Sequence, residues 1–184
     1  MHWLSKNTSM CWMKKIRKKL VEDILNVFSS KVLVNVSSLE KQVIHGDWNE
    51  HNIIVSQDER GEHFLSGFID IADVHYSYRV FDLGVAMAYM FMLENIDFST
   101  VEAAGHFFAG YQAVFPISEK ELSLLPEIMA ARFCQSLVFG TYTNKVLDPT
   151  NDYLLFTSKN WKTLQDFWKV PKKTYVQTWK DMCD

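Results

Sequence analysis

The sequence is poor in cysteine and in net charge, and both shortages exclude whole classes of protein. Its three cysteines, Cys11, Cys134 and Cys183, are odd in number and widely spaced, with no CxxC pair. They therefore predict neither a disulfide framework nor a zinc knuckle, and they fit a reducing compartment. The formal net charge is only −3, which gives the chain no overall attraction to nucleic acid or to anionic membranes.

Glycine and long apolar runs are also scarce. The seven glycines form neither a GxGxxG turn nor a P-loop, the two common glycine-rich cradles for phosphate. The N-terminus lacks the apolar core of a secretory signal, and the most apolar later stretch, residues 80–93, carries Asp82 and is too short to span a bilayer. We therefore expect a cytoplasmic protein without a membrane or nucleic-acid partner.

Apolar and aromatic residues are abundant. With 184 residues, 48% of them hydrophobic, the chain can bury a sizeable core and is predicted to form a single domain over residues 1–184. A basic cluster at residues 13–20, MKKIRKKL, could be a transit peptide or a helix for an anionic surface. Apolar residues recur every fourth position from Trp12 to Phe28, however, so we favour an amphipathic helix with solvated lysines.

The first half of the chain is predicted to hold a small amount of β-structure. Residues 31–36 (KVLVNV) and 42–44 (QVI) have the composition of short extended segments. Residues 52–55 (NIIV) and 64–70 (FLSGFID) flank a polar turn that contains Gly61, and this pattern predicts a β-hairpin.

From Val80 onward the pattern becomes helical. One helix is expected from Val80, and capping boxes predict that two more begin after Ser99 and Ser118. Pro126 is expected to end or kink the third, with another helix over residues 132–146 and an apolar stripe over 152–169. The fold class is therefore α+β, mostly helical, with one embedded hairpin.

The stretch VIHGDWNEHNIIV, residues 43–55, places polar residues between two β-branched runs. A hairpin brings its two ends together, so Asn52 before one strand and Asp70 after the other are predicted to face the same cavity. An amide oxygen and a carboxylate would suffice for Mg²⁺, which is usually held by one or two protein groups and by substrate phosphates. Asp47 is then left to accept a proton from an attacking hydroxyl. These three residues fit the roles that phosphoryl transfer requires.

The same residues carry a family resemblance. His45, Gly46, Asp47 and Asn52 match the HGDxxxxN catalytic loop of the aminoglycoside phosphotransferase and choline kinase group, whose fold is similar to that of protein kinases. Residues 68–73 (FIDIAD) resemble the group's metal-binding motif. The resemblance implies Asp47 as catalytic base, Asn52 and Asp70 as metal ligands, Mg²⁺ as the metal, and GTP or ATP as the phosphoryl donor. It also implies that three residues brace the loop: His45, Asp73 and Asp82.

A small-molecule acceptor is expected for two reasons. Protein kinases carry Arg where this chain has Gly46, and only eleven residues separate Asp70 from Asp82, too few for an activation segment. The loop HGDWNEHNI, the segment RFCQSLV and residues 152–164 resemble members of the group that phosphorylate 5-hydroxylysine, and choline or ethanolamine are the alternative acceptors. Candidate substrate-binding residues are Trp48, His51, Arg79 and Arg132.

A kinase of this kind also needs a phosphate-covering loop and a Lys paired with a Glu on an N-terminal β-lobe. The chain begins only one predicted helix before the catalytic loop, so it resembles the C-terminal lobe. A rival hypothesis is a truncated, catalytically impaired isoform or fragment that acts as a binding module. A further rival is a metal-dependent hydrolase that uses His45, Asp47 and His51 as ligands.

Overall fold

The computed structural model describes residues 13–93, 97–148, 150 and 160–183. The helices are α1 (Lys15–Val27), α2 (Arg79–Met90), α3 (Thr100–Val114), α4 (Glu119–Tyr142), α6 (Trp161–Lys169) and α7 (Lys172–Asp181). The strands are β1 (Lys41–Ile44), β2 (Ile53–Gln57), β3 (His63–Phe68) and β4 (His75–Tyr78). The short turns of other helix types are η3 (Phe28–Val32), η4 (Leu33–Ser38), η5 (Glu50–Asn52), η6 (Ile71–Asp73) and η7 (Thr143–Leu147).

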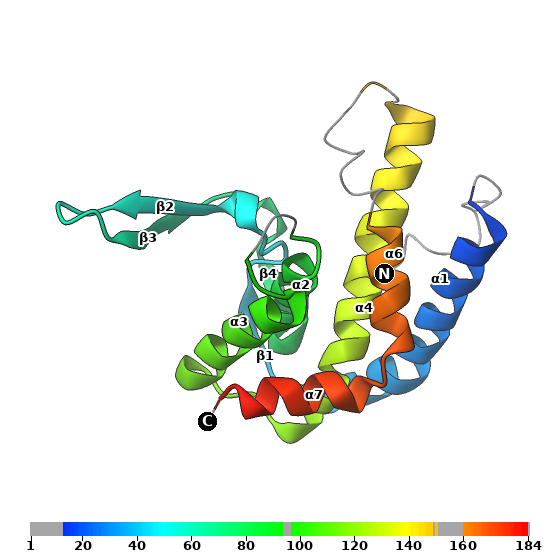
Figure 1. Ribbon diagram of the computed structural model, residues 1–184. Coiled ribbons are helices and arrows are strands. Elements are labelled where there is room, and N and C mark those ends of the chain that lie inside the picture. The colour runs from blue at the N-terminus through cyan, green and yellow to red at the C-terminus, as the bar shows by residue number, and fades with distance from the viewer. Residues whose placement is uncertain (1–12, 94–96, 149, 151–159, 184) are drawn as a thin grey trace.

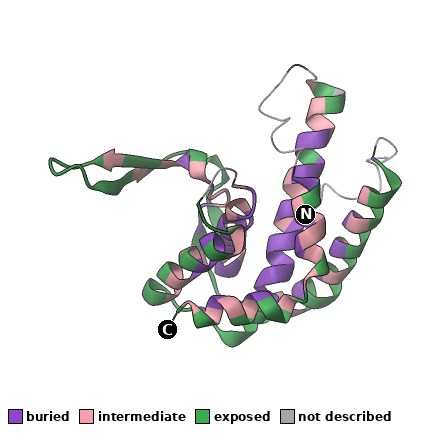
Figure 2. Cartoon of the chain, viewed as in Figure 1, coloured by how far each residue is buried: buried purple, intermediate pink, exposed green. Residues whose placement is uncertain are grey.

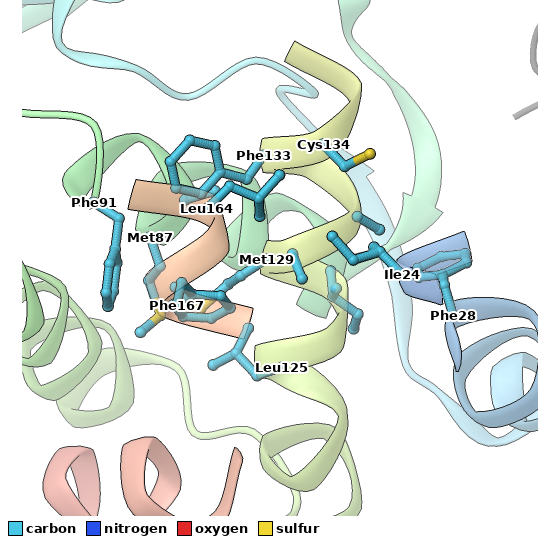
Figure 3. Close-up of a cluster of buried hydrophobic side chains, with 14 of the residues drawn as sticks. Ile24, Phe28, Met87, Phe91, Leu125, Met129, Phe133, Cys134, Leu164 and Phe167 are labelled. Carbon is cyan, nitrogen blue, oxygen red and sulfur yellow. The ribbon is translucent and has the colours of Figure 1, made fainter. Parts of the chain in front are cut away.

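Helix α4 is the centre of the fold. It contacts α1, α2, α6 and α7, and α3 lies against α2 and α7 (Figure 1). Leu125, Met129 and Phe133 on α4 pack against Met87 of α2 and Leu164 of α6, and all five side chains are buried (Figure 3). Burying side chains of this size contributes roughly 1.5–3 kcal/mol each, so this cluster fixes the position of α2 relative to α4.

Helix α7 closes the base of the helical body through aromatic stacking. The ring of Tyr175 stacks on Phe167 of α6 with centroids 4.6 Å apart, and Trp179 stacks on Tyr175 at 5.7 Å. Trp179 is fully buried. This helix was not expected from the sequence, because its exposed face is rich in lysine and polar residues and only two of its side chains are buried.

The strands form two separate antiparallel pairs. Strand β1 pairs with β4 in a register that sets Lys41 opposite Tyr78 and Ile44 opposite His75. Strands β2 and β3 form the predicted hairpin, with Ile53 opposite Phe68, and the hairpin projects from the helical body (Figure 1). Most of its surface is exposed, in contrast to α4 (Figure 2).

Several sequence predictions are confirmed. The fold is α+β and mostly helical, the hairpin lies where it was expected, and the capping boxes at Ser99 and Ser118 are both formed. Helix α1 exposes its lysines and buries Val21 and Ile24, in keeping with the amphipathic interpretation of the basic cluster. The predicted apolar stripe is buried only in part, because Ile16 is 73% exposed.

The structure differs from the sequence analysis at three places. Residues 31–36 are not extended: they lie in η3 and η4, which continue α1, since helical turns bury Val32 against the core. Strand β4 was missed because it pairs with a strand more than thirty residues earlier in the chain, a contact without a local pattern. Pro126 does not end its helix, because α4 continues from Glu119 to Tyr142 and also includes most of the separate helix expected over residues 132–146.

One helical stretch, Glu119–Lys145, is long and apolar enough to cross a membrane by length and composition. Its most apolar window is 72% buried inside the fold, which is the pattern of a core helix. The apolar stripe expected over residues 152–169 lies in part outside the described residues. Its described part forms α6.

Candidate active site

The loop after β1 is anchored by one carboxylate. Asp82, in the first turn of α2, accepts a hydrogen bond from the backbone N–H of His45 at 3.0 Å and another from Gly46 at 2.8 Å, one on each oxygen. The residue is buried, so these charge-assisted bonds form where water competes little. The loop is thereby tied to the same helix that packs on α4.

Gly46 lets the loop pass close to the residues that follow the hairpin. Its φ of +87° is disfavoured for residues with a Cβ, and an added Cβ would lie 2.7 Å from the backbone oxygen of Asp73. The main chain of Asp73 therefore contacts the loop, which is how this predicted bracing residue meets it. No side chain, and certainly no Arg, fits at this position without moving the backbone.

His45 links the loop to the end of the hairpin. Its Nδ1 accepts a hydrogen bond from the backbone N–H of Asp47 at 3.3 Å, so Nε2 carries the proton and donates to the carbonyl of Ile69 at 3.0 Å. The ring also packs on Trp48, with centroids 4.6 Å apart. The buried imidazole of His45 thus contacts backbone groups on both sides, and its predicted role as a brace of the loop stays a prediction.

Asn52 and Asp70 are brought together by the hairpin. The backbone N–H of Ile69 donates to the carbonyl of Asn52 at 3.0 Å, which places Asp70 one residue beyond the pair. The side-chain amide of Asn52 donates to the carbonyl of Asp47 at 2.9 Å, so its Oδ1 oxygen is turned away from that carbonyl. The structure thus places Asp47, Asn52 and Asp70 at one end of the hairpin.

Asp70 has an unusual backbone conformation. Its φ and ψ are both 61°, which makes it the only non-glycine residue with positive φ in the described part of the chain. The left-handed region costs a non-glycine residue of order 1–3 kcal/mol, and such strain clusters at functional sites. The carboxylate is exposed at the end of the hairpin, where a cation could reach it.

Two residues that contact Asp47 come from distant helices. Arg132 of α4 forms an ion pair with Oδ1 of Asp47, and the hydroxyl of Tyr89 of α2 donates to the same oxygen at 3.3 Å. Arg132 also donates to the hydroxyl of Tyr89 at 3.0 Å. On the other oxygen, Oδ2, the side-chain amide of Asn49 donates at 3.2 Å.

Tyr89 was missed by the sequence analysis. It lies seven residues after Asp82, two helical turns on, so both project from the same face of α2 toward the loop. That spacing was a usable signal. Burial raises the pKa of the Tyr89 hydroxyl, which keeps it protonated and able to donate. Arg132 was considered only as a substrate ligand, and nothing local in the sequence connects it to Asp47.

Apart from Arg132, the other three of the four substrate-binding candidates occupy different environments. Trp48 packs between His45 and Phe68 and lines a mostly apolar hollow of about 290 Å³. His51 is exposed, and its Nε2 lies 3.5 Å from Glu50. Arg79 requires a correction: it is buried and donates to the carboxylate of Glu40 at 2.7 Å and to a backbone carbonyl. These partners give Arg79 a structural role, and the arginine at Asp47 is Arg132.

The donor set favours a hard cation that shares its coordination with phosphate. Among the described residues no group of three or more His, Cys, Asp or Glu side chains could hold a metal ion. The ring nitrogens of His45 are both engaged, so the predicted zinc cluster of His45, Asp47 and His51 is not formed. An Asn oxygen and an Asp carboxylate fit Mg²⁺, which commonly needs only one or two protein ligands beside substrate phosphates.

Comparison with known proteins agrees with this geometry. Residues 9–116 match the phosphotransferase enzyme family. The chain belongs to this family. Its protein-kinase-like fold and the predicted family resemblance are therefore confirmed.

Curated relatives of this phosphotransferase chain include hydroxylysine kinases from Mus musculus, Xenopus laevis and Danio rerio. The chain is 32% identical to that of Mus musculus over 167 residues, 31% identical to that of Xenopus laevis over 173 residues, and 31% identical to that of Danio rerio over 163 residues. These matches take in 88%, 91% and 88% of the chain but only 44%, 46% and 45% of the relatives. The chain thus spans less than half the length of the relatives it matches.

Proposed function

We propose that this chain is the catalytic lobe of a small-molecule kinase that transfers the γ-phosphate of GTP to the hydroxyl of 5-hydroxylysine. The observation that carries the proposal is the convergence of Asp47, Asn52 and Asp70 at the end of one hairpin, on a loop anchored by Asp82. The acceptor rests on the names of the relatives, and GTP rests on the family resemblance. A role in lysine and hydroxylysine breakdown and a cytoplasmic location remain predictions.

The hydrogen bonds around Asp47 support Oδ2 as the atom that takes the proton. A carboxylate oxygen has about two lone-pair sites, and Oδ1 already accepts from Arg132 and Tyr89. Among the described residues Oδ2 accepts only from Asn49, which leaves one site open. The acceptor hydroxyl donates its proton to Oδ2 as its oxygen forms a bond to the γ-phosphorus, and the bond to the leaving diphosphate breaks.

Asn52 and Asp70 would hold Mg²⁺ on the phosphate side of this reaction. When bound, the ion neutralises the charge that develops on the phosphoryl oxygens. Asn52 is oriented for this role by its bond to the carbonyl of Asp47, which ties the metal ligand to the loop that carries the base. The chain's own contribution is to fix the base and the two ligands relative to each other before substrates arrive.

The rival function is a binding module with little turnover of its own. Exposed apolar side chains gather on and around the hairpin, among them Leu65, Phe68 and Ile71, which are 73%, 58% and 65% exposed. Exposed apolar patches mark surfaces that another element covers. We therefore expect the 184 residues alone to have little activity, and a larger assembly to be needed for the nucleotide.

A chimera tests the proposal. The part of the mouse hydroxylysine kinase outside the match would be joined to this chain and assayed with Mg²⁺, GTP or ATP, and hydroxylysine, choline or ethanolamine as acceptor. We expect phosphorylation of hydroxylysine with GTP, and a loss of about 100-fold or more in Asp47→Asn, since a positioned general base contributes roughly 10²–10⁴-fold. The unfused chain should show under a hundredth of the chimera's rate.

Two results would contradict the proposal. Equal rates for the chimera and its Asp47→Asn variant would remove Asp47 from the chemistry. Preference for choline or ethanolamine over hydroxylysine would support the alternative acceptors instead. Metal binding can be measured separately on the unfused chain, where Mn²⁺ should broaden the NMR signals of Asn52 and Asp70 and leave those of α6 sharp.

A further inference from the structure

A hollow of about 350 Å³ opens beside the catalytic loop, between the β1–β4 pair, α2 and α4. Gly46 lies on its edge, directly before Asp47. Its wall is largely apolar and includes Phe28, Val85 and Ile128. Arg132 and Gln135 of α4 line the same hollow. An aliphatic chain fits such a wall, with a polar group at the arginine.

Arg132 has hydrogen-bonding capacity that the described residues do not use. Both N–H groups of its Nη2 are engaged, by Asp47 and by Tyr89. Its Nη1 carries two N–H groups but makes one long contact, of 3.4 Å to Oε1 of Gln135. Nη1 is therefore the nitrogen of the guanidinium that can donate to a ligand in the hollow.

The proposed chemistry places the acceptor next to this arginine. The acceptor hydroxyl must reach Oδ2 of Asp47, while Arg132 contacts Oδ1 of the same carboxylate. The carbon chain that bears the hydroxyl therefore begins within a few ångströms of the guanidinium. The apolar wall of the hollow offers the rest of that chain a path along α4.

Among the alternative acceptors, a carboxylate is the distinguishing group. Hydroxylysine ends in the same amino-alcohol unit as ethanolamine, so the hydroxyl and its neighbouring ammonium cannot separate the two. The other end of hydroxylysine carries a carboxylate, which ethanolamine and choline lack. An arginine fork matches a carboxylate in both charge and geometry.

We propose that Arg132 is a specificity-determining residue that binds the carboxylate of the acceptor through Nη1 while Nη2 holds Asp47. The inference rests on the proposed function and names the acceptor class as carboxylate-bearing amino alcohols. Asp47 and the acceptor's carboxylate contact the same arginine, so binding of the carboxylate positions the acceptor's hydroxyl relative to Asp47. The hollow receives its aliphatic stem.

Binding to the unfused chain tests this without any turnover. Titration calorimetry would compare 5-hydroxylysine with its decarboxylated analogue, 1,5-diaminopentan-2-ol, and with inorganic phosphate. A charge-assisted pair contributes about 1.5–3 kcal/mol, so we expect hydroxylysine to bind at least about tenfold tighter than the analogue. Arg132→Gln should abolish that difference by weakening hydroxylysine alone, and Arg132→Lys should keep only part of it.

The controls separate this inference from the proposed function. Arg60→Gln removes an exposed arginine in the turn of the hairpin, outside the lining of the hollow. It should leave the ratio of the affinities for hydroxylysine and its analogue unchanged. Asp47→Asn should abolish transfer in the chimera and retain the ratio. Thermal unfolding of each variant confirms that it is folded.

Three outcomes would overturn the inference. One is equal affinity for hydroxylysine and the analogue in the unsubstituted chain, including no measurable binding of either at 10 mM, roughly the weakest range that calorimetry resolves. Another is an unchanged ratio in Arg132→Gln. The last is loss of phosphate binding in Arg132→Gln with the ratio preserved, which would assign the arginine to the phosphoryl group.

Discussion

The strongest structural prediction concerns Asp82, which anchors the catalytic loop. Its two oxygens accept from the backbone N–H groups of His45 and Gly46 at 3.0 and 2.8 Å. A hydrogen bond to a charged group contributes about 1.5–3 kcal/mol, so Asp82→Ala should lose about 3–6 kcal/mol of folding free energy, a large share of the total for one domain. Asp82→Asn can accept only one of the two bonds and should lose about 2–4 kcal/mol.

Urea unfolding of the unfused chain, followed by circular dichroism, measures the loss. Hydrogen exchange localises it, because the amides of His45 and Gly46 should lose protection before those of α4. Asp23→Asn, on the exposed face of α1, is the matched control and should change the free energy by less than about 0.5 kcal/mol. If Asp82→Asn is as stable as the unsubstituted chain and the two amides stay protected, the carboxylate does not anchor the loop.

Three further predictions follow from local geometry. Gly46→Ala should destabilise by about 1–3 kcal/mol more than Gly61→Ala in urea unfolding, since both have positive φ but only the first would meet Asp73; equal losses would show that the loop has room. Burial lowers the pKa of Lys172 to about 8 from an ordinary value of 10.5, so the folded state binds the proton less tightly than the unfolded state does. The free energy of unfolding, relative to that of Lys172→Met, should therefore rise between pH 8 and pH 10.5. A difference that does not change with pH would contradict this. Tyr89→Phe, which removes a donor to the candidate base, should lower the kcat of the chimera about tenfold with little change in KM, and an unchanged kcat would leave the hydroxyl without a role.

The candidate catalytic loop and the hairpin could be predicted because their sequence patterns are local. Asp47 and Asn52 are five residues apart, and the turn between β2 and β3 has the polar composition that closes a hairpin. A hairpin joins its own ends, so the proximity of Asn52 and Asp70 followed without knowledge of the rest of the fold. The capping boxes were readable for the same reason, since Ser and Glu three residues apart satisfy each other's backbone.

The errors arose where distant parts of the chain decide the local structure. The β-branched segment at residues 31–36 has strand propensity, but it follows α1 directly and packs as helical turns against α4. Strand β4 exists because β1 is there to pair with it. Pro126 is tolerated inside α4, where the surrounding core supports the helix on several sides.

The sequence by itself predicted the candidate base Asp47, the candidate oxygen ligands Asn52 and Asp70, and the hairpin that brings them together. Only the tertiary structure decided what surrounds the base. Arg132 is 85 residues from Asp47, and the packing of α4 on α2 places its guanidinium on that carboxylate beside Tyr89. Local periodicity specifies which face of a helix is buried, but the residue that a partly buried charged side chain contacts depends on how whole helices pack.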